Sequence, residues 1–261
     1  MRILFNCIVS RNNELVEDMI TNIQKFVKDP LIVFHVHPIK FPSFDKSVIN
    51  RYKNVFVNSE QLNLDDHNAN INLNTHRPFI HAFLSNFKYI TNNCKEEFDY
   101  HIIFYEKMMF CRHGIEEYIK NYDGCFYYCR AVECIPNVAK YFQKGLLKNL
   151  SEGLTSNFEI TKKMFDYYCS NEELYNYNGW AGEEVIVSSF LFNNCNTPGM
   201  PPVIVQPKCC ATISDAVEII EQTKYEIDAL SIGKRKTSEI FIIHRVDSDL
   251  ENPLRVFIRS L

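Results

Sequence analysis

The hydrophobic and polar positions of this chain alternate between short apolar runs and segments with helical spacing. Apolar runs at 3–9, 31–37 and 54–59 predict three strands, the second of which ends before a proline. Between the first two runs, the apolar residues of 15–27 recur at the spacing of a helix that buries one face. Strand, helix and strand in this order predict a parallel sheet with crossover helices.

The same patterns continue to the end of the chain. They predict helices over 78–89, 114–120, 159–169, 184–193 and 216–230, and strands over 99–106, 125–129 and 240–243. The proline-rich segment 197–202 predicts a loop, not a linker between domains. We therefore expect one α/β domain over 1–261, with a mostly parallel central sheet flanked by helices.

Composition narrows the class of protein. The 261 residues are 46% hydrophobic and 23% charged, as in an ordinary globular domain. The net charge is −4 and no basic run exceeds Lys234–Lys236, so we expect no nucleic-acid partner. No apolar stretch approaches the roughly 20 residues of a membrane span. The ten cysteines are scattered without a CxxC pair, which favours reduced core residues and a cytoplasmic location.

The segment 178–185 carries the most informative chemistry. Glu183 and Glu184 follow a glycine turn and stand at the head of the apolar run 185–191. A carboxylate at such a junction can face a cleft and accept the proton of a sugar hydroxyl. The alternative is a solvated acidic pair that opens a helix, since acidic residues suit a helix N-terminus. Trp180 is either a stacking wall for a sugar or a buried anchor.

Six short segments carry a resemblance to a known family. They are Phe34–His37, Asn54–Val57, Asp99–Phe104, Glu152–Phe158, Gly182–Glu184 and Ile242–Asp247. In this order they resemble motifs of the glycosyltransferase family that contains the core-2/I-branching N-acetylglucosaminyltransferases and peptide O-xylosyltransferase. The resemblance implies a GT-A-like domain in which 1–123 binds the nucleotide-sugar and 124–261 binds the acceptor and carries catalysis.

The activity that the resemblance implies is an inverting, metal-independent sugar transfer. A GlcNAc-class or xylose-class sugar would move from a nucleotide-diphosphate donor, expected to be a UDP-sugar, to a glycan hydroxyl, with no metal cofactor. Glu184 stands in the place of the catalytic base, and Arg245 in that of the basic residue at the donor diphosphate. The other candidates are His244, His35, His37 and Arg77 for the donor, and Glu183, Glu152 and Trp180 for the acceptor.

The chain also departs from the family pattern. His37 replaces an aspartate near the nucleoside, Glu106 and Lys107 replace small polar residues, and the membrane anchor of the animal enzymes is missing. These departures suit a distant bacterial or viral member in the cytoplasm. A second cation for the diphosphate could be His244 or the cluster Lys234–Lys236.

Two alternatives and the assembly stay open at this point. One alternative is a metal-dependent glycosyltransferase that uses Asp247 and Asp249, or the pair His35 and His37. A solvated loop is the favoured interpretation of the two aspartates, because lone short motifs are weak evidence. The other is a relative that binds a nucleotide or glycan without turnover. Both a monomer and a homodimer are compatible with the sequence.

Overall fold

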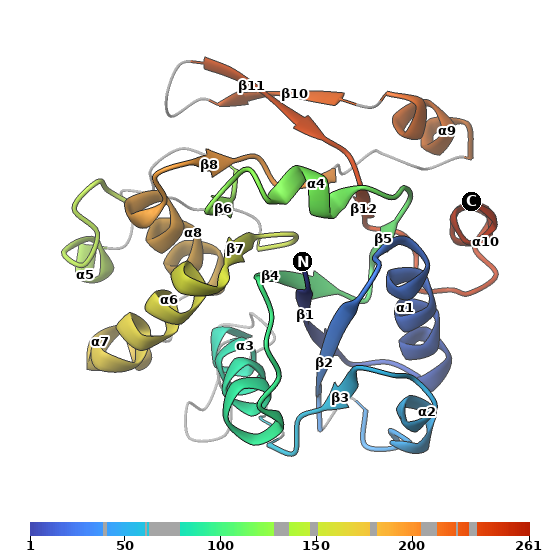
Figure 1. Ribbon diagram of the computed structural model, residues 1–261, viewed down its shortest axis with the longest axis horizontal. Coiled ribbons are helices and arrows are strands. Elements are labelled where there is room, and N and C mark those ends of the chain that lie inside the picture. Colours follow the sequence, from blue (N-terminus) through green and yellow to red (C-terminus); the bar gives the residue numbers. More distant parts are fainter. Residues whose placement is uncertain are drawn as a thin grey trace.

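The computed structural model describes most of the chain and gives one α/β architecture (Figure 1). The residues it describes are 1–38, 41–60, 62, 79–127, 136–146, 151–177, 182–204, 213–222, 224–229 and 234–261. Among the helices of these segments, none is both long enough and apolar enough to cross a membrane.

A seven-stranded, mostly parallel sheet forms the centre of the molecule, in the order β3-β2-β1-β4-β7-β6-β8. The strands are β1 (Ile3–Val9), β2 (Pro30–Val36), β3 (Val55–Val57), β4 (Tyr100–Tyr105), β6 (Gly124–Cys125), β7 (Thr155–Asn157) and β8 (Pro198–Gly199). Strands β1 to β4 are parallel, so their carboxyl ends meet at one edge, which we call the carboxyl edge. Strand β7 lies antiparallel beside β4. In sheets of this kind ligands bind outside the carboxyl ends of the strands.

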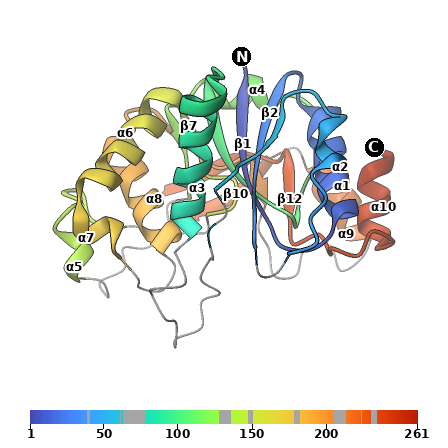
Figure 2. The same ribbon diagram turned by 90° about the horizontal axis from the view of Figure 1, so that it is seen from below.

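Helices cover both faces of this sheet (Figures 1 and 2). One face carries α3 (Phe79–Lys88), α6 (Phe158–Ser170) and α8 (Gly182–Asn194), and the other carries α1 (Asn13–Phe26) and α4 (Ile115–Ile119). A π-helical turn (Tyr89–Cys94) extends α3, and short helices α2 (Ser47–Asn50), α5 (Pro136–Ala139) and α7 (Glu172–Tyr175) lie at the periphery. Because both faces are covered, every residue of β1 and β2 is buried, which explains their continuous apolar runs.

Asn6 is the polar exception within β1, and a buried hydrogen-bond network satisfies it. Its Nδ2 donates to the backbone oxygen of Phe83 (2.8 Å), and Nδ2 of Asn86 donates to its Oδ1 (2.8 Å). Nε2 of His101 lies 3.1 Å from the same Nδ2. Burial lowers the pKa of His101 to about 3, so this ring is neutral at pH 7. The network ties α3 to the sheet, because buried polar groups are costly unless they are paired.

A smaller three-stranded sheet joins the central one, in the order β5-β12-β9. Its strands are β5 (Met108–Phe110), β12 (Ile242–His244) and β9 (Val203–Ile204). The hairpin β10 (Lys224–Ala229) and β11 (Lys234–Glu239) and the helices α9 (Ile213–Glu221) and α10 (Pro253–Ser260) complete the described elements. Figure 1 shows the hairpin at the periphery, away from the central sheet.

Arg255 of α10 fastens the end of β4 to the segment after β12. Its side chain is fully buried, and its guanidinium donates to the backbone oxygens of Glu106 (3.3 Å) and Asp247 (2.7 Å). It also pairs with the carboxylate of Asp18 in α1. The C-terminal helix therefore fixes the relative positions of β4, β12 and α1 at the carboxyl edge.

The structure confirms the α/β class and the predicted N-terminal order of strands and helices. The helix predicted over 216–230 is wrong in its second half, because α9 ends at Glu221 and the segment Lys224–Ala229 is strand β10. The antiparallel partner β11 satisfies the backbone of this segment, and pairing between distant residues overrides local propensity. The predicted loop 197–202 contains the two-residue strand β8.

Candidate functional site

Charged side chains gather at the carboxyl edge where β1 and β4 end. Glu106 follows β4, and its carboxylate accepts hydrogen bonds from the backbone N–H of Ser10 (3.1 Å) and from Nε of Arg11 (2.6 Å). The protein itself therefore supplies hydrogen bonds to this carboxylate, and Arg11 neutralises its charge. From the sequence, Glu106 and Lys107 stood out only as departures from a family pattern. Their position at the end of the predicted strand 99–106 was the signal that they belong to this edge.

The end of β12 contributes Arg245 in an unusual backbone conformation. Its φ of +71° lies in the left-handed region, which costs a non-glycine residue about 1–2 kcal/mol. The sharp turn leaves His244 and Val246 buried while the side chain of Arg245 is exposed. The N–H of Val246 donates to the backbone oxygen of Lys107 (3.1 Å), which holds the turn in place. Strain held in this way is typical of functional sites.

A glycine turn carries Glu152 to the same place. Gly153 has a φ of +71°, and a Cβ there would lie 2.1 Å from Cγ2 of Val203 in β9. Only a glycine allows this turn to pass so close to the small sheet. On its other side the turn is fixed by a hydrogen bond between the hydroxyls of Ser151 and Tyr105 (2.8 Å). As a result Oε1 of Glu152 lies 3.6 Å from Nδ1 of His244.

The electrostatics of this pair follow from its burial. Burial raises the pKa of Glu152 above the ordinary value, while the nearby Arg245 partly opposes that rise. Burial lowers the pKa of His244 to about 4, and Arg245 and Lys107 lower it further. His244 is therefore neutral at pH 7, so the structure does not support it as the second cation. Oε2 of Glu152 is buried and has no hydrogen-bond partner among the described residues.

His35 in β2 and His37 just after it also lie at the carboxyl edge, and both side chains are buried. The backbone N–H of Leu62 donates to Nε2 of His35 (3.2 Å), and burial lowers the pKa of His35 to about 4. The backbone N–H of His37 donates to the oxygen of Val9 (2.9 Å). Both residues stand near the ends of β1 and β2, where their role at a donor stays a prediction.

Glu184 lies in the first turn of α8 and is half-buried. Helix α8 packs against α3 and α6. Cys195, just after its last residue, contacts Gly124, which stands at the level of the first residues of β4. With 13 residues, α8 is about 20 Å long, so it reaches from there toward the carboxyl edge. In both ribbon views, however, α8 and β12 lie on opposite sides of β1 (Figures 1 and 2).

The remaining predicted residues are only partly placed. Arg77 and Trp180 lie outside the described residues. The backbone of Glu183 belongs to α8, and that of Lys234–Lys236 belongs to β11. The structure describes only the backbone of these residues, not their side chains. The structure thus brings Glu152, His244 and Arg245 together and places Glu184 on another element of the same edge.

Asp247 and Asp249 occupy a polar turn after β12. The N–H of Asp249 donates to Oδ1 of Asp247 (2.9 Å), and the N–H of Glu251 donates to Oδ1 of Asp249 (3.0 Å). Both aspartates are exposed, which supports the interpretation of this tripeptide as a solvated loop. Within the described part of the chain, no group of three or more His, Cys, Asp or Glu side chains is arranged to hold a metal ion.

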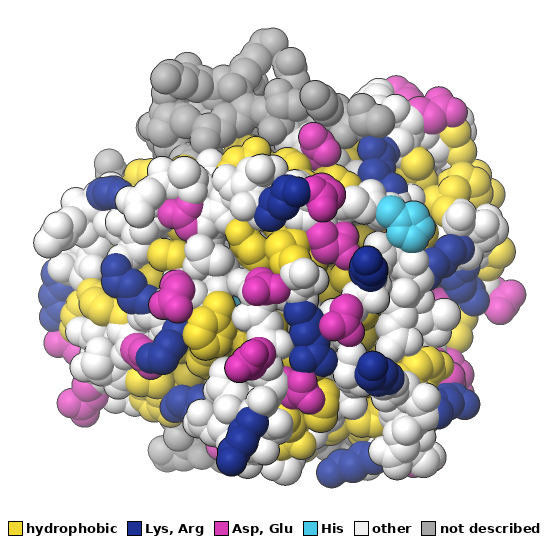
Figure 3. Space-filling model, viewed as in Figure 1, with side chains coloured by type: hydrophobic (Ala, Val, Ile, Leu, Met, Phe, Trp, Pro, Cys, Tyr) yellow, Lys and Arg dark blue, Asp and Glu magenta, His cyan; other side chains and the backbone are white. Residues whose placement is uncertain are grey.

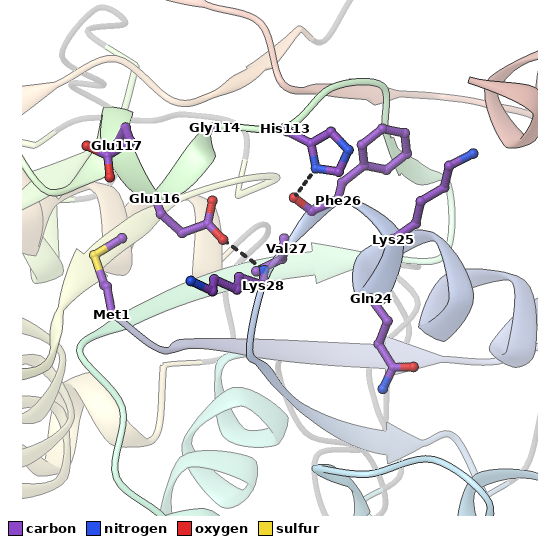
Figure 4. Close-up of a pocket in the computed structure, with 10 residues that line it drawn as sticks. All are labelled: Met1, Gln24, Lys25, Phe26, Val27, Lys28, His113, Gly114, Glu116 and Glu117. Atoms are coloured by element: carbon purple, nitrogen blue, oxygen red, sulfur yellow. Dashed lines mark hydrogen bonds between the residues drawn. The ribbon is translucent and has the colours of Figure 1, made fainter.

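A hollow of about 570 Å³ lies at the opposite edge of the sheet, around Met1 and the junction of α1 and β2 (Figure 4). Two polar side chains that line it contact backbone groups. Oε1 of Glu116 accepts from the N–H of Lys28 (3.0 Å), and Nδ1 of His113 lies 3.2 Å from the backbone oxygen of Phe26. We therefore assign this hollow to the packing of α4 against α1. The face drawn in Figure 3 shows acidic and basic side chains interspersed, without a large patch of one sign among its coloured residues.

Comparison with known proteins leaves the family open. No protein-family model matches the chain, and no curated protein matches it. The geometry of the carboxyl edge therefore supplies the observations from which a function can be proposed.

Proposed function

We propose that this protein is an inverting glycosyltransferase of GT-A type that moves a sugar from a nucleotide-diphosphate donor to a glycan hydroxyl. The observation that carries the proposal is the exposed side chain of Arg245 at the carboxyl edge, near enough to the largely buried carboxylate of Glu152 to lower its pKa. A fixed cation there suits the phosphate oxygens of a donor. The side chain of Glu152 keeps 17% of its surface exposed, and a carboxylate oxygen can accept a hydrogen bond from a sugar hydroxyl.

The proposed reaction is a single displacement at the anomeric carbon. The acceptor oxygen forms the new bond, and its proton passes to the carboxylate of Glu184 as general base. The bond between the anomeric carbon and the diphosphate oxygen breaks, and its electron pair leaves with the diphosphate. The positive charge of Arg245 stabilises the negative charge that develops on this leaving group. The N-terminus of α8 favours the ionised carboxylate that a base requires.

The acceptor side of the proposal rests on Glu152, with Glu183 and Trp180 as further predicted contacts. The carboxylate of Glu152 lies beside His244 of β12 and close enough to Arg245 to feel its charge, so an acceptor bound there would stand near Arg245. The nucleoside of the donor would lie over the ends of β1 and β2, near His35 and His37. A UDP-sugar with a GlcNAc-class or xylose-class sugar stays the expected donor.

The first experiment identifies the donor and then tests the base. A thermal-shift screen with UDP-, GDP-, dTDP- and CMP-linked sugars finds the ligand, because binding to the native state raises Tm. Release of the nucleotide from that donor is then measured for the wild type, Glu184→Gln and Glu159→Gln. Glu159 is the matched control, because it is an exposed carboxylate in the first turn of α6 at the opposite edge.

We expect Glu184→Gln to lower the rate of nucleotide release by about 10²–10⁴-fold, the usual contribution of a general base. Donor binding and Tm should stay at wild-type values, and Glu159→Gln should keep full activity. Equal rates for the two variants would refute Glu184 as the base. Activity that disappears in EDTA and returns with a divalent cation would favour the metal-dependent alternative. Donor binding without any release or transfer would favour a binding protein.

A further inference from the structure

Two hollows meet between α3 and α6, away from the carboxyl edge. The narrower has a volume of about 280 Å³ and lies between the end of α3, its π-helical extension and α6. The wider, of about 700 Å³, extends to Arg2, and Thr91 and Phe158 line both. Phe158 lies at the amino end of β4, because its N–H donates to the oxygen of Asp99 (2.8 Å). Both ribbon views show α3 and α6 side by side (Figures 1 and 2). The two hollows form one groove, which we call the α3–α6 groove.

Phenylalanine rings form the apolar wall of this groove. Phe87 and Phe165 are buried, and their ring centroids lie 4.9 Å apart. Phe158 is only half-buried, and its ring centroid lies 5.2 Å from that of Phe98 and 6.3 Å from that of Phe87. Close packing holds these rings in place, so the exposed part of Phe158 is a fixed apolar surface. Such a surface can stack against the C–H face of a ligand ring.

The rim of the narrower hollow carries hydrogen-bond donors and acceptors. Asn92 is exposed; its Oδ1 accepts from Oγ1 of Thr91 (3.3 Å), and its Nδ2 points no hydrogen bond at another described residue. Lys88, at the end of α3, is also exposed. On the opposite wall, the exposed carboxylate of Asp166 pairs with Lys162 through one of its two oxygens. Amide, ammonium and carboxylate groups thus surround one small hollow.

These features select among classes of ligand. A purely apolar ligand would leave the polar side chains of the rim without partners, which costs free energy. A multivalent anion needs several unpaired cations, whereas Lys162 is already paired with Asp166. The wider hollow is lined by both basic and acidic side chains, which are Arg2, Lys95, Glu96, Glu97 and Asp99. A neutral ring with hydroxyl groups fits best, because its hydroxyls donate and accept while its C–H face lies on a phenyl ring.

We propose that the α3–α6 groove binds a neutral oligosaccharide, at a site separate from the carboxyl edge. Phe158 supplies the stacking surface, Nδ2 of Asn92 donates to one hydroxyl, and the carboxylate of Asp166 accepts from another. The narrower hollow is close to the smallest small-molecule sites, about 300 Å³, so it holds one sugar ring, and the wider hollow holds the next. The site goes beyond the proposed function and does not depend on it. For a transferase that acts on glycans, the groove would hold a remote part of the acceptor.

The test measures binding of three neutral tetrasaccharides to the full chain by calorimetry. The probes are cellotetraose, xylotetraose and the β1,4-linked tetramer of GlcNAc, and the variants are Asn92→Ala, Asp166→Ala and the control Asn93→Ala. Asn93 is the next residue of the same π-helical turn, is exposed, and is not among the residues that line either hollow. We expect the wild type and the Asn93 variant to bind at least one probe equally. Binding should weaken about 3- to 10-fold in Asn92→Ala and at least about 10-fold in Asp166→Ala, because hydrogen bonds to charged groups contribute more.

A second readout separates binding from folding and locates the saccharide. The three substituted residues are exposed, so each variant should unfold near the Tm of the wild type. Added saccharide should raise Tm less in Asn92→Ala and Asp166→Ala than in Asn93→Ala. The inference is overturned if none of the three probes binds the wild type, or if both groove variants bind as tightly as Asn93→Ala. Binding that is lost only in Glu152→Gln would also overturn it, because the saccharide would then lie at the carboxyl edge.

The outcome is distinguishable from that of the proposed function. Saccharide binding that depends on Asn92 and Asp166, with no sugar transfer from any donor, would keep the groove as a binding site and reject the transferase. Sugar transfer from a nucleotide donor, with saccharide binding that is the same in all three variants, would keep the transferase and reject the groove.

Discussion

Gly153 offers the sharpest test of how the candidate site is built. In Gly153→Ala the new Cβ would lie 2.1 Å from Cγ2 and 3.0 Å from Cβ of Val203, a distance that no relaxed contact shows. The residue also has a φ of +71°. The left-handed backbone costs alanine about 1–2 kcal/mol, and forcing an extra methyl into a packed site costs about 1–3 kcal/mol more. We therefore expect a loss of about 2–5 kcal/mol in the free energy of unfolding.

Gly145 provides a matched control within the same chain. Its φ is +98°, but a Cβ there would meet no atom within 4 Å. Gly145→Ala should therefore cost only the backbone contribution of about 1–2 kcal/mol. Urea unfolding at pH 7 measures both variants, and in a chain of this size Tm should fall by about 2–4 °C for each kcal/mol. If Gly153→Ala were no less stable than Gly145→Ala, the steric argument would be rejected.

A double-mutant cycle identifies the clashing partner. Val203→Ala removes Cγ2, so it should be less harmful when Gly153 is already alanine. We expect a coupling free energy of about 1–3 kcal/mol in favour of the double variant. Additive losses would show that the turn moves away from β9. In that case the position of Glu152 beside His244 would depend less on this contact than the structure indicates.

Two further predictions concern buried charges near the site. Arg255→Met should lower the free energy of unfolding by about 3 kcal/mol, because breaking a buried ion pair leaves Asp18 poorly compensated. Urea unfolding measures this loss. A loss below about 1 kcal/mol would contradict the conclusion that Arg255 holds α10 against the carboxyl edge. His244 has a pKa of about 4 in the native state and about 6.5 in the unfolded chain. The unfolded state therefore binds more protons than the native state between these values, and stability should fall with falling pH in this window by up to about 1.4 kcal/mol per pH unit. His244→Gln should reduce the loss measured between pH 6.5 and pH 4.5, and an unchanged loss would mean that His244 titrates normally in the folded protein.

The sequence alone determined the fold class and most of the N-terminal half. The runs over 3–9 and 31–37 are apolar at nearly every position, because strands covered on both faces have no solvent side. Helix α1 could be predicted because its apolar spacing is regular. The structure adds that Asn12 caps it, with Oδ1 accepting from the N–H of Leu15. Local pattern failed at Lys224–Ala229, where an antiparallel partner converts the predicted helix into a strand.

Only the tertiary structure decided which candidate residues meet. Glu152, His244 and Arg245 were all candidates from the sequence, but their contact depends on the pairing of β7 with β4 and of β5 with β12. Strands of three residues carry no periodic signal, and their register spans more than 100 positions of the chain. The same pairing brings the backbone of Lys107 to the turn at Arg245, where it accepts a hydrogen bond from the N–H of Val246. Hydrophobic spacing predicts which helices and strands form and which face each of them buries. The contacts between the ends of these helices and strands follow from long-range packing.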